Sequence, residues 1–380
     1  MNRLDMFSDI LLPSLLFAIA FGALVPHGRP GTSGHTQPKD EGFPPDSVTP
    51  DGRVNQLPLN FNIDDSQHAG QVEIGGSFWA NAFVHGSDGH DYYIAVHVMD
   101  YGSNIPGAKP VYRGAIMGIT DPSFYVKVGP TISPETKFYD KNDNFHAIFD
   151  NFGMETTSNS DALQGIHAYS SIGDVEFDFT FNHTSPVLLN AALGSYLVNG
   201  KTGYEWSLPR GATGGWLKKD GEVINIVPSH SQSWYDRQWG SLQDSFSWLA
   251  VNFPDPVPSW LDVSIACVWD WQDNVNGSKQ FATVRSARTG RDSVIPVNVT
   301  VSTTNTYMSS VSGLVYPSEG TVVLGDIKLF VTTPRPDQIF EPSEEGTGFP
   351  PQFSGYVEVV AKKKGEQSVK GYGAVDFMKL

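Results

Sequence analysis

The chain has 380 residues and a formal net charge of −16, and 39% of its residues are hydrophobic, 12% aromatic and 17% charged. This composition is typical of a chain that folds around a core, and the length allows two domains. The longest basic cluster is 362–364, so the chain lacks the concentrated positive charge that nucleic acid or an anionic membrane surface requires of a partner.

The first 25 residues have the layout of a secretory signal peptide. Arg3 precedes an apolar run from Ile10 to Val25, and cleavage is expected after Ala20 or Gly22. The run is shorter than the roughly 20 apolar residues of a membrane span, so an uncleaved anchor is the alternative and no stable span is expected. The sequence therefore predicts a protein of the secretory pathway, secreted or lumenal.

Three glycosylation sequons agree with this route, and they begin at Asn182, Asn276 and Asn298. The single cysteine, Cys267, excludes an intramolecular disulfide and a thiolate metal cluster. It lies in an apolar run and is expected to be a small buried side chain.

The region after the signal peptide divides into three parts. Residues 26–62 form a predicted extended lead, because residues 26–60 hold seven prolines. The proline-rich loop of residues 252–259 marks the best domain boundary. We expect an N-terminal β-domain over residues 63–250 and a C-terminal β-domain over residues 251–380.

Short strands separated by turns are predicted throughout, since 38 Gly and 26 Pro punctuate the chain. Residues 72–84 and 92–100 flank a hairpin turn at Asp88-Gly89. Val175 to Phe181 alternates apolar and polar residues, as a strand with one wet face does. Further strands are expected at residues 223–228, 263–271, 281–287, 295–303, 321–332 and 356–362. An all-β fold of antiparallel barrels or sandwiches follows.

The segment from His230 to Gly240 is the most informative part of the chain. In a strand, one face would carry His230, Trp234, Asp236 and Gln238, and the other Tyr235, Arg237 and Trp239. A carboxyl flanked by indoles is a candidate general acid, because an apolar environment raises its pKa. The alternative is a core strand in which Asp236 and Arg237 neutralise each other.

Other chemistries have weaker support. His85, Asp88, His90 and Asp91 lie close together, but a hairpin tip explains them and no metal motif is present, so no metal is expected. Neither a nucleophile elbow nor a dinucleotide loop occurs. A glycosidase with a sugar platform at Trp269–Asp273 stays an alternative, although the sequence places no second acid.

A wider pattern resembles a known family. Tyr204-Glu-Trp-Ser-Leu-Pro-Arg210, then Gly214-Gly-Trp-Leu, then the segment ending at Gly240 resembles the family of kievitone hydratase and the carotenoid hydratases, to which fungal Diels–Alderases are related. Residues 316–322, 353–359 and 371–375 are similar to the last strands of that family. The resemblance covers roughly residues 70–380.

The resemblance implies two lipocalin-like β-domains in tandem, a hydrophobic pocket and no cofactor. Asp236 matches the essential acid of the carotenoid hydratases, and Tyr204 falls where their partner histidine is expected. Their neighbouring His-Asn is Arg237-Gln238 here. The chain is therefore closer to the kievitone-hydratase branch.

From these residues we expect a cofactor-free enzyme, a monomer, acting on a hydrophobic phenolic, polyketide or terpene substrate. The candidate catalytic residues are Asp236, Arg237 and Tyr204. The candidate substrate-binding residues are Trp79, Trp206, Arg210, His230, Trp234 and Trp239.

Three functions stay open. Dehydration of a benzylic alcohol by Asp236 gives a quinone methide, and a hetero-Diels–Alderase would then steer its cycloaddition with an alkene. This cyclase is the leading expectation. A kievitone-hydratase-like hydro-lyase would add or remove water at the same site. A secreted lipocalin-like carrier would bind an apolar metabolite without turnover. An ion pair of Arg210 or Arg237 with Asp236 would leave the carboxyl ionised.

Overall fold

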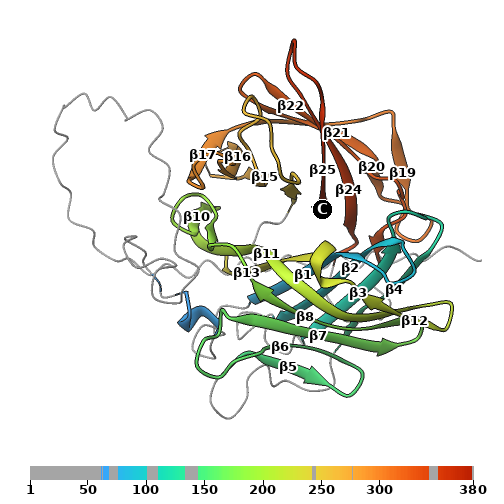
Figure 1. Cartoon of the computed structure of the whole chain (residues 1–380). Coiled ribbons are helices and arrows are strands. Elements are labelled where there is room, and N and C mark those ends of the chain that lie inside the picture. The colour runs from blue at the N-terminus through green and yellow to red at the C-terminus, as the bar shows by residue number, and fades with distance from the viewer. Residues whose placement is uncertain are drawn as a thin grey trace, which may run out of the picture. The chain divides into compact units, whose positions relative to one another are not determined.

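The structure is a computed structural model that describes residues 61, 63–67, 76–100, 110–132, 144–241, 245–275, 277–341 and 350–378. The predicted signal peptide and all but Phe61 of the predicted lead lie outside the described residues. Strands dominate the described residues, and two curled antiparallel sheets account for nearly all of them (Figure 1). The expected all-β fold is therefore confirmed.

The first sheet has the strand order β4-β3-β2-β1-β13-β11-β8-β7-β6-β5, with β9, β10 and β12 paired to β11. Its strands are β1 (Gly76–His85), β2 (Asp91–Asp100), β3 (Val111–Gly118), β4 (Tyr125–Ile132), β5 (His146–Phe149), β6 (Phe152–Thr156), β7 (Gly165–Ile172), β8 (Val175–His183), β9 (Leu188–Leu189), β10 (Ser195–Val198), β11 (Lys201–Lys219), β12 (Glu222–Ile226) and β13 (Gln232–Gly240).

The second sheet has the order β17-β16-β15-β14-β25-β24-β22-β21-β18, with β23 paired to β24. Its strands are β14 (Phe246–Asn252), β15 (Ile265–Asp273), β16 (Gly277–Arg285), β17 (Asp292–Pro296), β18 (Asn298–Val301), β21 (Glu319–Leu324), β22 (Ile327–Thr332), β23 (Ile339–Phe340), β24 (Gln352–Lys362) and β25 (Val369–Met378). A separate hairpin joins β19 (Thr306–Met308) and β20 (Val315–Pro317).

The predicted hairpin and the alternating strand are present. β1 and β2 pair around the turn at Asp88-Gly89, and β8 buries Val175, Phe177, Phe179 and Phe181 on one face. The single strands expected at residues 295–303 and 321–332 are each two strands, divided at Val297 and at the turn before Ile327. β14 lies across the predicted boundary at residues 250 and 251, and it pairs within the second sheet.

β11 is a 19-residue strand that the predicted elements do not include. It contains Pro209, which has no N–H for a sheet ladder, and its register against β13 shifts between Leu208 and Gly211. A bulge at this point accommodates the proline inside a central strand. The strand therefore continues past Pro209 and brings the residues of its first half beside β13.

Three apolar layers alternate with the two sheets. The first sheet buries Phe78, Tyr235 and Trp239 in a core on one face, and the second sheet buries Val251 and Leu329 in a core on its far face. The third cluster is shared between the sheets. It joins Trp79, Tyr93 and Trp234 of the first sheet to Trp248, Trp269 and Tyr356 of the second.

A short 3-10 helix, η2 (Asp65–Gln67), lies against the first core. The Trp206 indole donates a hydrogen bond of 2.8 Å to Ser66 Oγ, and the Tyr235 hydroxyl donates one of 2.9 Å to Gln67 Oε1. Arg237 Nε donates to the backbone carbonyl of Ser66 at 3.0 Å. The face of β11 and β13 that carries these side chains is therefore occupied by the chain itself.

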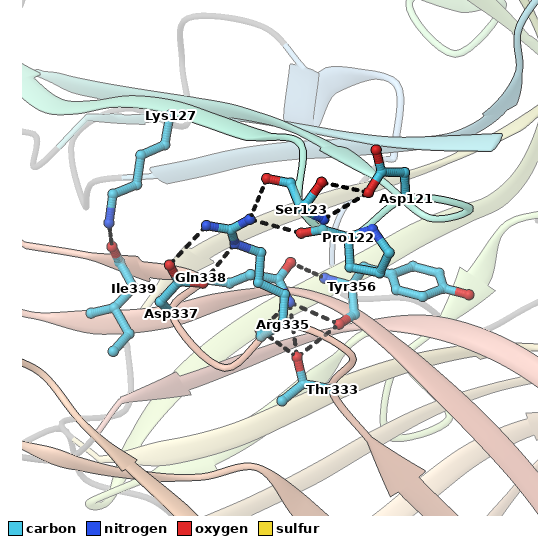
Figure 2. Close-up of polar contacts among 10 residues, drawn as sticks. All are labelled: Asp121, Pro122, Ser123, Lys127, Thr333, Arg335, Asp337, Gln338, Ile339 and Tyr356. Carbon is cyan, nitrogen blue, oxygen red and sulfur yellow. Dashed lines mark hydrogen bonds and ion pairs between the residues drawn. The ribbon is translucent and has the colours of Figure 1, made fainter. Parts of the chain in front are cut away.

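Polar contacts also connect the sheets at the turn between β3 and β4 (Figure 2). Arg335 forms a bidentate ion pair with Asp337 and donates to the carbonyls of Pro122 at 2.7 Å and Ser123 at 2.9 Å. Its guanidinium lies 4.8 Å from the centre of the Tyr125 ring. Because Asp337 and the two carbonyls fix the guanidinium, Arg335 connects the second sheet to the first.

Replacing Arg335 tests the strength of this connection. We expect Arg335→Ala to lower the free energy of unfolding by about 1–3 kcal/mol, since two carbonyls and a carboxylate lose their donor. Arg288→Ala is the control, because Arg288 is 73% exposed and lies 3.6 Å from Asp262. Such a surface pair contributes about 0–1 kcal/mol. Equal losses in urea denaturation of the two variants would contradict the connection.

Candidate active site

A cavity lies between β1, β11 and β13 of the first sheet and β14, β15 and β25 of the second. The space open to the centre of a water molecule is about 40 Å³, which is enough for a few water molecules. Three acids, four aromatic side chains and two other polar residues line it: Glu205, Asp236, Asp376, Trp79, Phe246, Trp248, Trp269, Ser77 and Gln238. A small wet space is thus enclosed by indoles and carboxyls.

Strand register places these side chains opposite one another. Asp236 of β13 pairs with Trp79 of β1 and with Ser207 of β11, so the three share one face of the first sheet. In the second sheet, Trp248 of β14 pairs with Asp376 of β25 and with Trp269 of β15. The Trp79 and Trp248 rings meet edge to face with centroids 4.7 Å apart. These two rows of paired residues form the walls of the cavity.

Asp236 is surrounded by neutral groups. Its Oδ1 accepts a hydrogen bond from Ser207, and its Oδ2 accepts one of 2.8 Å from the Trp234 indole. Burial raises the pKa of Asp236 to about 8, against the lowering effect of these donors, and the charge of Asp376 adds to the rise. Burial outweighs the two hydrogen bonds because both donors are uncharged. The carboxyl therefore retains its proton at neutral pH.

Glu205 is a second buried acid beside the first. It accepts hydrogen bonds from the Trp248 indole at 3.2 Å and from the Tyr196 hydroxyl at 3.0 Å, and Gln238 donates to that hydroxyl. Burial, and then the nearby Asp236, raise the pKa of Glu205 well above its ordinary value. Two carboxyls that share one cavity hold at least one proton between them.

The third acid, Asp376, has a charged partner. Arg113 Nη2 donates to Asp376 Oδ2 at 3.2 Å, although the two residues lie in different sheets. Arg113 Nε also donates to His97 Nδ1 at 2.9 Å, and His97 Nε2 is 2.8 Å from Ser77 Oγ. Burial and then Arg113 lower the pKa of His97 well below its ordinary value, so the imidazole is neutral. The guanidinium is thus directed at Asp376.

The structure brings together some of the residues predicted from sequence. Asp236 and Trp79 line the cavity, and Trp234 holds the Asp236 carboxyl. Arg237, Tyr204, Trp206 and Trp239 lie on the opposite face of β11 and β13, as the alternation predicts. Tyr204 stacks on Trp239 there, with ring centroids 5.0 Å apart.

The two predicted arginines lie away from Asp236. The Arg237 guanidinium is 4.1 Å from the centre of the Phe78 ring on the opposite face of β13. Arg210 pairs with Asp255 at 3.2 Å and donates to the carbonyl of Phe253. The ion pair that was the alternative to an acidic Asp236 is therefore replaced, for both arginines, by other contacts.

His230 is not in the strand. It ends a 3-10 helix, η5 (Pro228–His230), is exposed and lies 5.8 Å from the His85 ring. Of the sequons, Asn182 on β8 and Asn298 on β18 are exposed, whereas Asn276 lies outside the described residues. Within the described ranges, no group of three or more His, Cys, Asp or Glu side chains is placed to hold a metal ion.

Sequence reasoning missed Glu205 and Asp376. Glu205 lies between Tyr204 and Trp206, so strand alternation alone puts it on the other face from those two. That signal was available once β11 was recognised as a strand. Asp376 gave no signal, because its place depends on contact between strands 140 residues apart, β13 and β25.

Comparisons with known proteins agree with the motif. Kievitone hydratase from Fusarium solani subsp. phaseoli is 26% identical over 337 residues, which cover 85% of this chain and 87% of that protein. The dehydratase AsqC from Emericella nidulans is 23% identical over 336 residues, covering 85% and 90%. The predicted resemblance to kievitone hydratase is therefore confirmed. No protein-family model matches the chain.

The fold has a solved counterpart. The crystal structure of kievitone hydratase from Nectria haematococca superposes with a TM-score of 0.70 at 21% identity, and the match covers 88% of this chain and 97% of that one. The expected lipocalin-like tandem arrangement is confirmed at the level of fold. Among the described residues, no helix has the length and apolarity needed to cross a bilayer.

The raised pKa of Asp236 predicts a pH-dependent stability. The folded state holds a proton that the unfolded chain releases above its ordinary pKa of 3.8. Stability from this group is therefore full at low pH and is lost as the pH rises through about 8. Asp236→Asn stays neutral, so we expect it to lose less stability than wild type between about pH 5 and about pH 9 in urea denaturation. Parallel losses would mean that Asp236 is not protonated in the fold.

Proposed function

We propose that this chain is a hydro-lyase of secondary metabolism, which adds water to or removes water from an apolar phenolic or isoprenoid substrate. The observation that carries the proposal is Asp236, a buried acid whose pKa is raised to about 8 in a cavity that admits water. A carboxyl that is protonated near neutral pH can act as a general acid, which is typically worth about 10² to 10⁴ in rate. The names of both curated relatives, a hydratase and a dehydratase, support the same reaction class.

In hydration, Asp236 gives its proton to an alkene carbon, and a C–H bond forms there. The resulting cation lies among Trp79, Trp248 and Trp269, whose ring faces stabilise positive charge by about 0.5–2 kcal/mol each when well placed. Water then forms the C–O bond and releases a proton. In dehydration the same acid protonates the leaving hydroxyl. Neither direction moves electrons to or from the substrate, so the reaction needs no redox cofactor.

The space around Asp236 accommodates water but not a whole prenylated phenol. We infer that the substrate displaces this water and moves side chains that line the cavity, such as Phe246, when it binds. Kievitone, the compound in the name of one relative, is the natural first probe.

The cyclase expected from sequence shares the dehydration and differs in the step after it. Once water has left a benzylic alcohol, the quinone methide would react with an alkene held in the same space. The hydro-lyase is the better supported of the two, because it requires only the acid and the water-sized cavity. A cycloaddition is a distinguishable outcome of an assay that compares product masses.

The assay uses kievitone, other prenylated phenols and phenolic benzylic alcohols, with and without a terpene alkene. We expect wild type to add or remove one water, and Asp236→Asn to lose about 10² to 10⁴ in rate with folding intact. The control is Asp270→Asn, because Asp270 lies on the neighbouring strand β15 outside the cavity. An adduct with the alkene would favour the cyclase, and tight binding without turnover would favour a carrier.

We further propose that residues 1–25 direct the chain into the secretory pathway. Secretion from a eukaryotic host should give an N-terminus after Ala20 or Gly22 and a mass that falls on treatment with peptide N-glycosidase. Asn298→Gln should remove one glycan, since Asn298 is exposed. A full-length, unglycosylated protein retained in the cytosol would contradict this route.

A further inference from the structure

The cavity holds a third acid whose role the general-acid step does not explain. Asp376 comes from the second sheet and reaches the cavity that Asp236 reaches from the first. Its side chain is 14% exposed, and its Oδ1 is buried without a hydrogen-bond partner among the described residues. An oxygen in this position has lone pairs available for a water molecule in the cavity.

We propose that Asp376 is the general base of the reaction and that Arg113 keeps it ionised, so that the two sheets each contribute one half of an acid–base pair. This inference rests on the proposed hydro-lyase function. It assigns the acid to Asp236 of the first sheet and the base to Asp376 of the second.

The partners of the two acids carry the assignment. Asp236 accepts hydrogen bonds from an indole and a hydroxyl, whereas Asp376 is bonded to a guanidinium at 3.2 Å. Arg113 is 2% exposed, so this contact is little screened by solvent. A cation at this distance favours the ionised carboxylate, and neutral donors in a buried site favour it much less.

The groups around Asp376 come from several strands. They are Arg113 on β3, Tyr93 on β2, Asp236 on β13, and Gln352 and Ser354 on β24. Burial raises the pKa of Asp376, and Arg113 lowers it. Its charge in turn raises the pKa of Asp236. A proton on one acid and a charge on the other are therefore mutually stabilising.

The step balances with these two groups. Asp236 gives its proton to the alkene carbon, the oxygen of water forms the C–O bond, and one proton of that water passes to the Asp376 carboxylate. The proton then returns from Asp376 to Asp236 through water in the cavity. Both carboxyls end in their starting states, and dehydration runs the same path backwards.

The first test measures protonation without turnover. The infrared carbonyl band of protonated Asp236, identified by its loss in Asp236→Asn, is titrated in wild type, Asp376→Asn and Asp292→Asn. Asp292 is the matched control, since it forms another buried ion pair, 2.7 Å from Arg285, outside the cavity. We expect Asp376→Asn to shift the titration of Asp236 to lower pH and Asp292→Asn to leave it in place. An unchanged midpoint in Asp376→Asn would overturn the proposal.

The second test separates a base from a structural ion pair. Asp376→Asn should lose about 10² to 10⁴ in the rate of water addition to kievitone, together with the acidic limb of the pH profile. The double variant Arg113→Met, Asp376→Asn removes both charges and should stay as inactive even where it regains thermal stability. Recovered activity in the double variant would mean that Asp376 only neutralises Arg113. Wild-type inactivity would instead count against the hydro-lyase, and the infrared test would still decide the charge of Asp376.

Discussion

Removal of Asp236 and Glu205 from water is the constraint on which the rest of the site depends. Each sheet alone would leave these carboxyls on an open face, where water would keep them ionised. The second sheet covers that face with Trp248 and Trp269 and so raises the pKa of both acids. Chemistry and architecture are therefore linked, because the contact that encloses the cavity also protonates its acid.

The same contact explains why the site is divided between sheets. An acid and a base side by side in one row of a single sheet would experience the same environment. Here Asp236 is among neutral donors of the first sheet, while Arg113 reaches across to Asp376 of the second. The separation allows opposite protonation states within one small cavity. The opposite face of β13 is filled by Arg237 and Trp239 and supports the strand from behind.

The sequence was sufficient for part of this account. Alternation along residues 230–240 predicted correctly that Asp236 faces away from Arg237, because period two is fixed by the strand itself. It failed at His230, where the chain turns before the strand begins. Asp376 and Arg113 could not be predicted, since their meeting depends on packing between sheets. Glu205 required recognition of β11, which Pro209 concealed until the bulge was seen.

The central claim is that one buried carboxyl holds a proton at neutral pH beside another that does not. Neutron diffraction from crystals of the protein equilibrated in heavy water at neutral pD observes these protons directly. The account predicts a deuteron on a carboxyl oxygen of Asp236 and none on Asp376. A bare carboxylate at Asp236 would contradict the assignment of the acid and, with it, the proposed chemistry of the cavity.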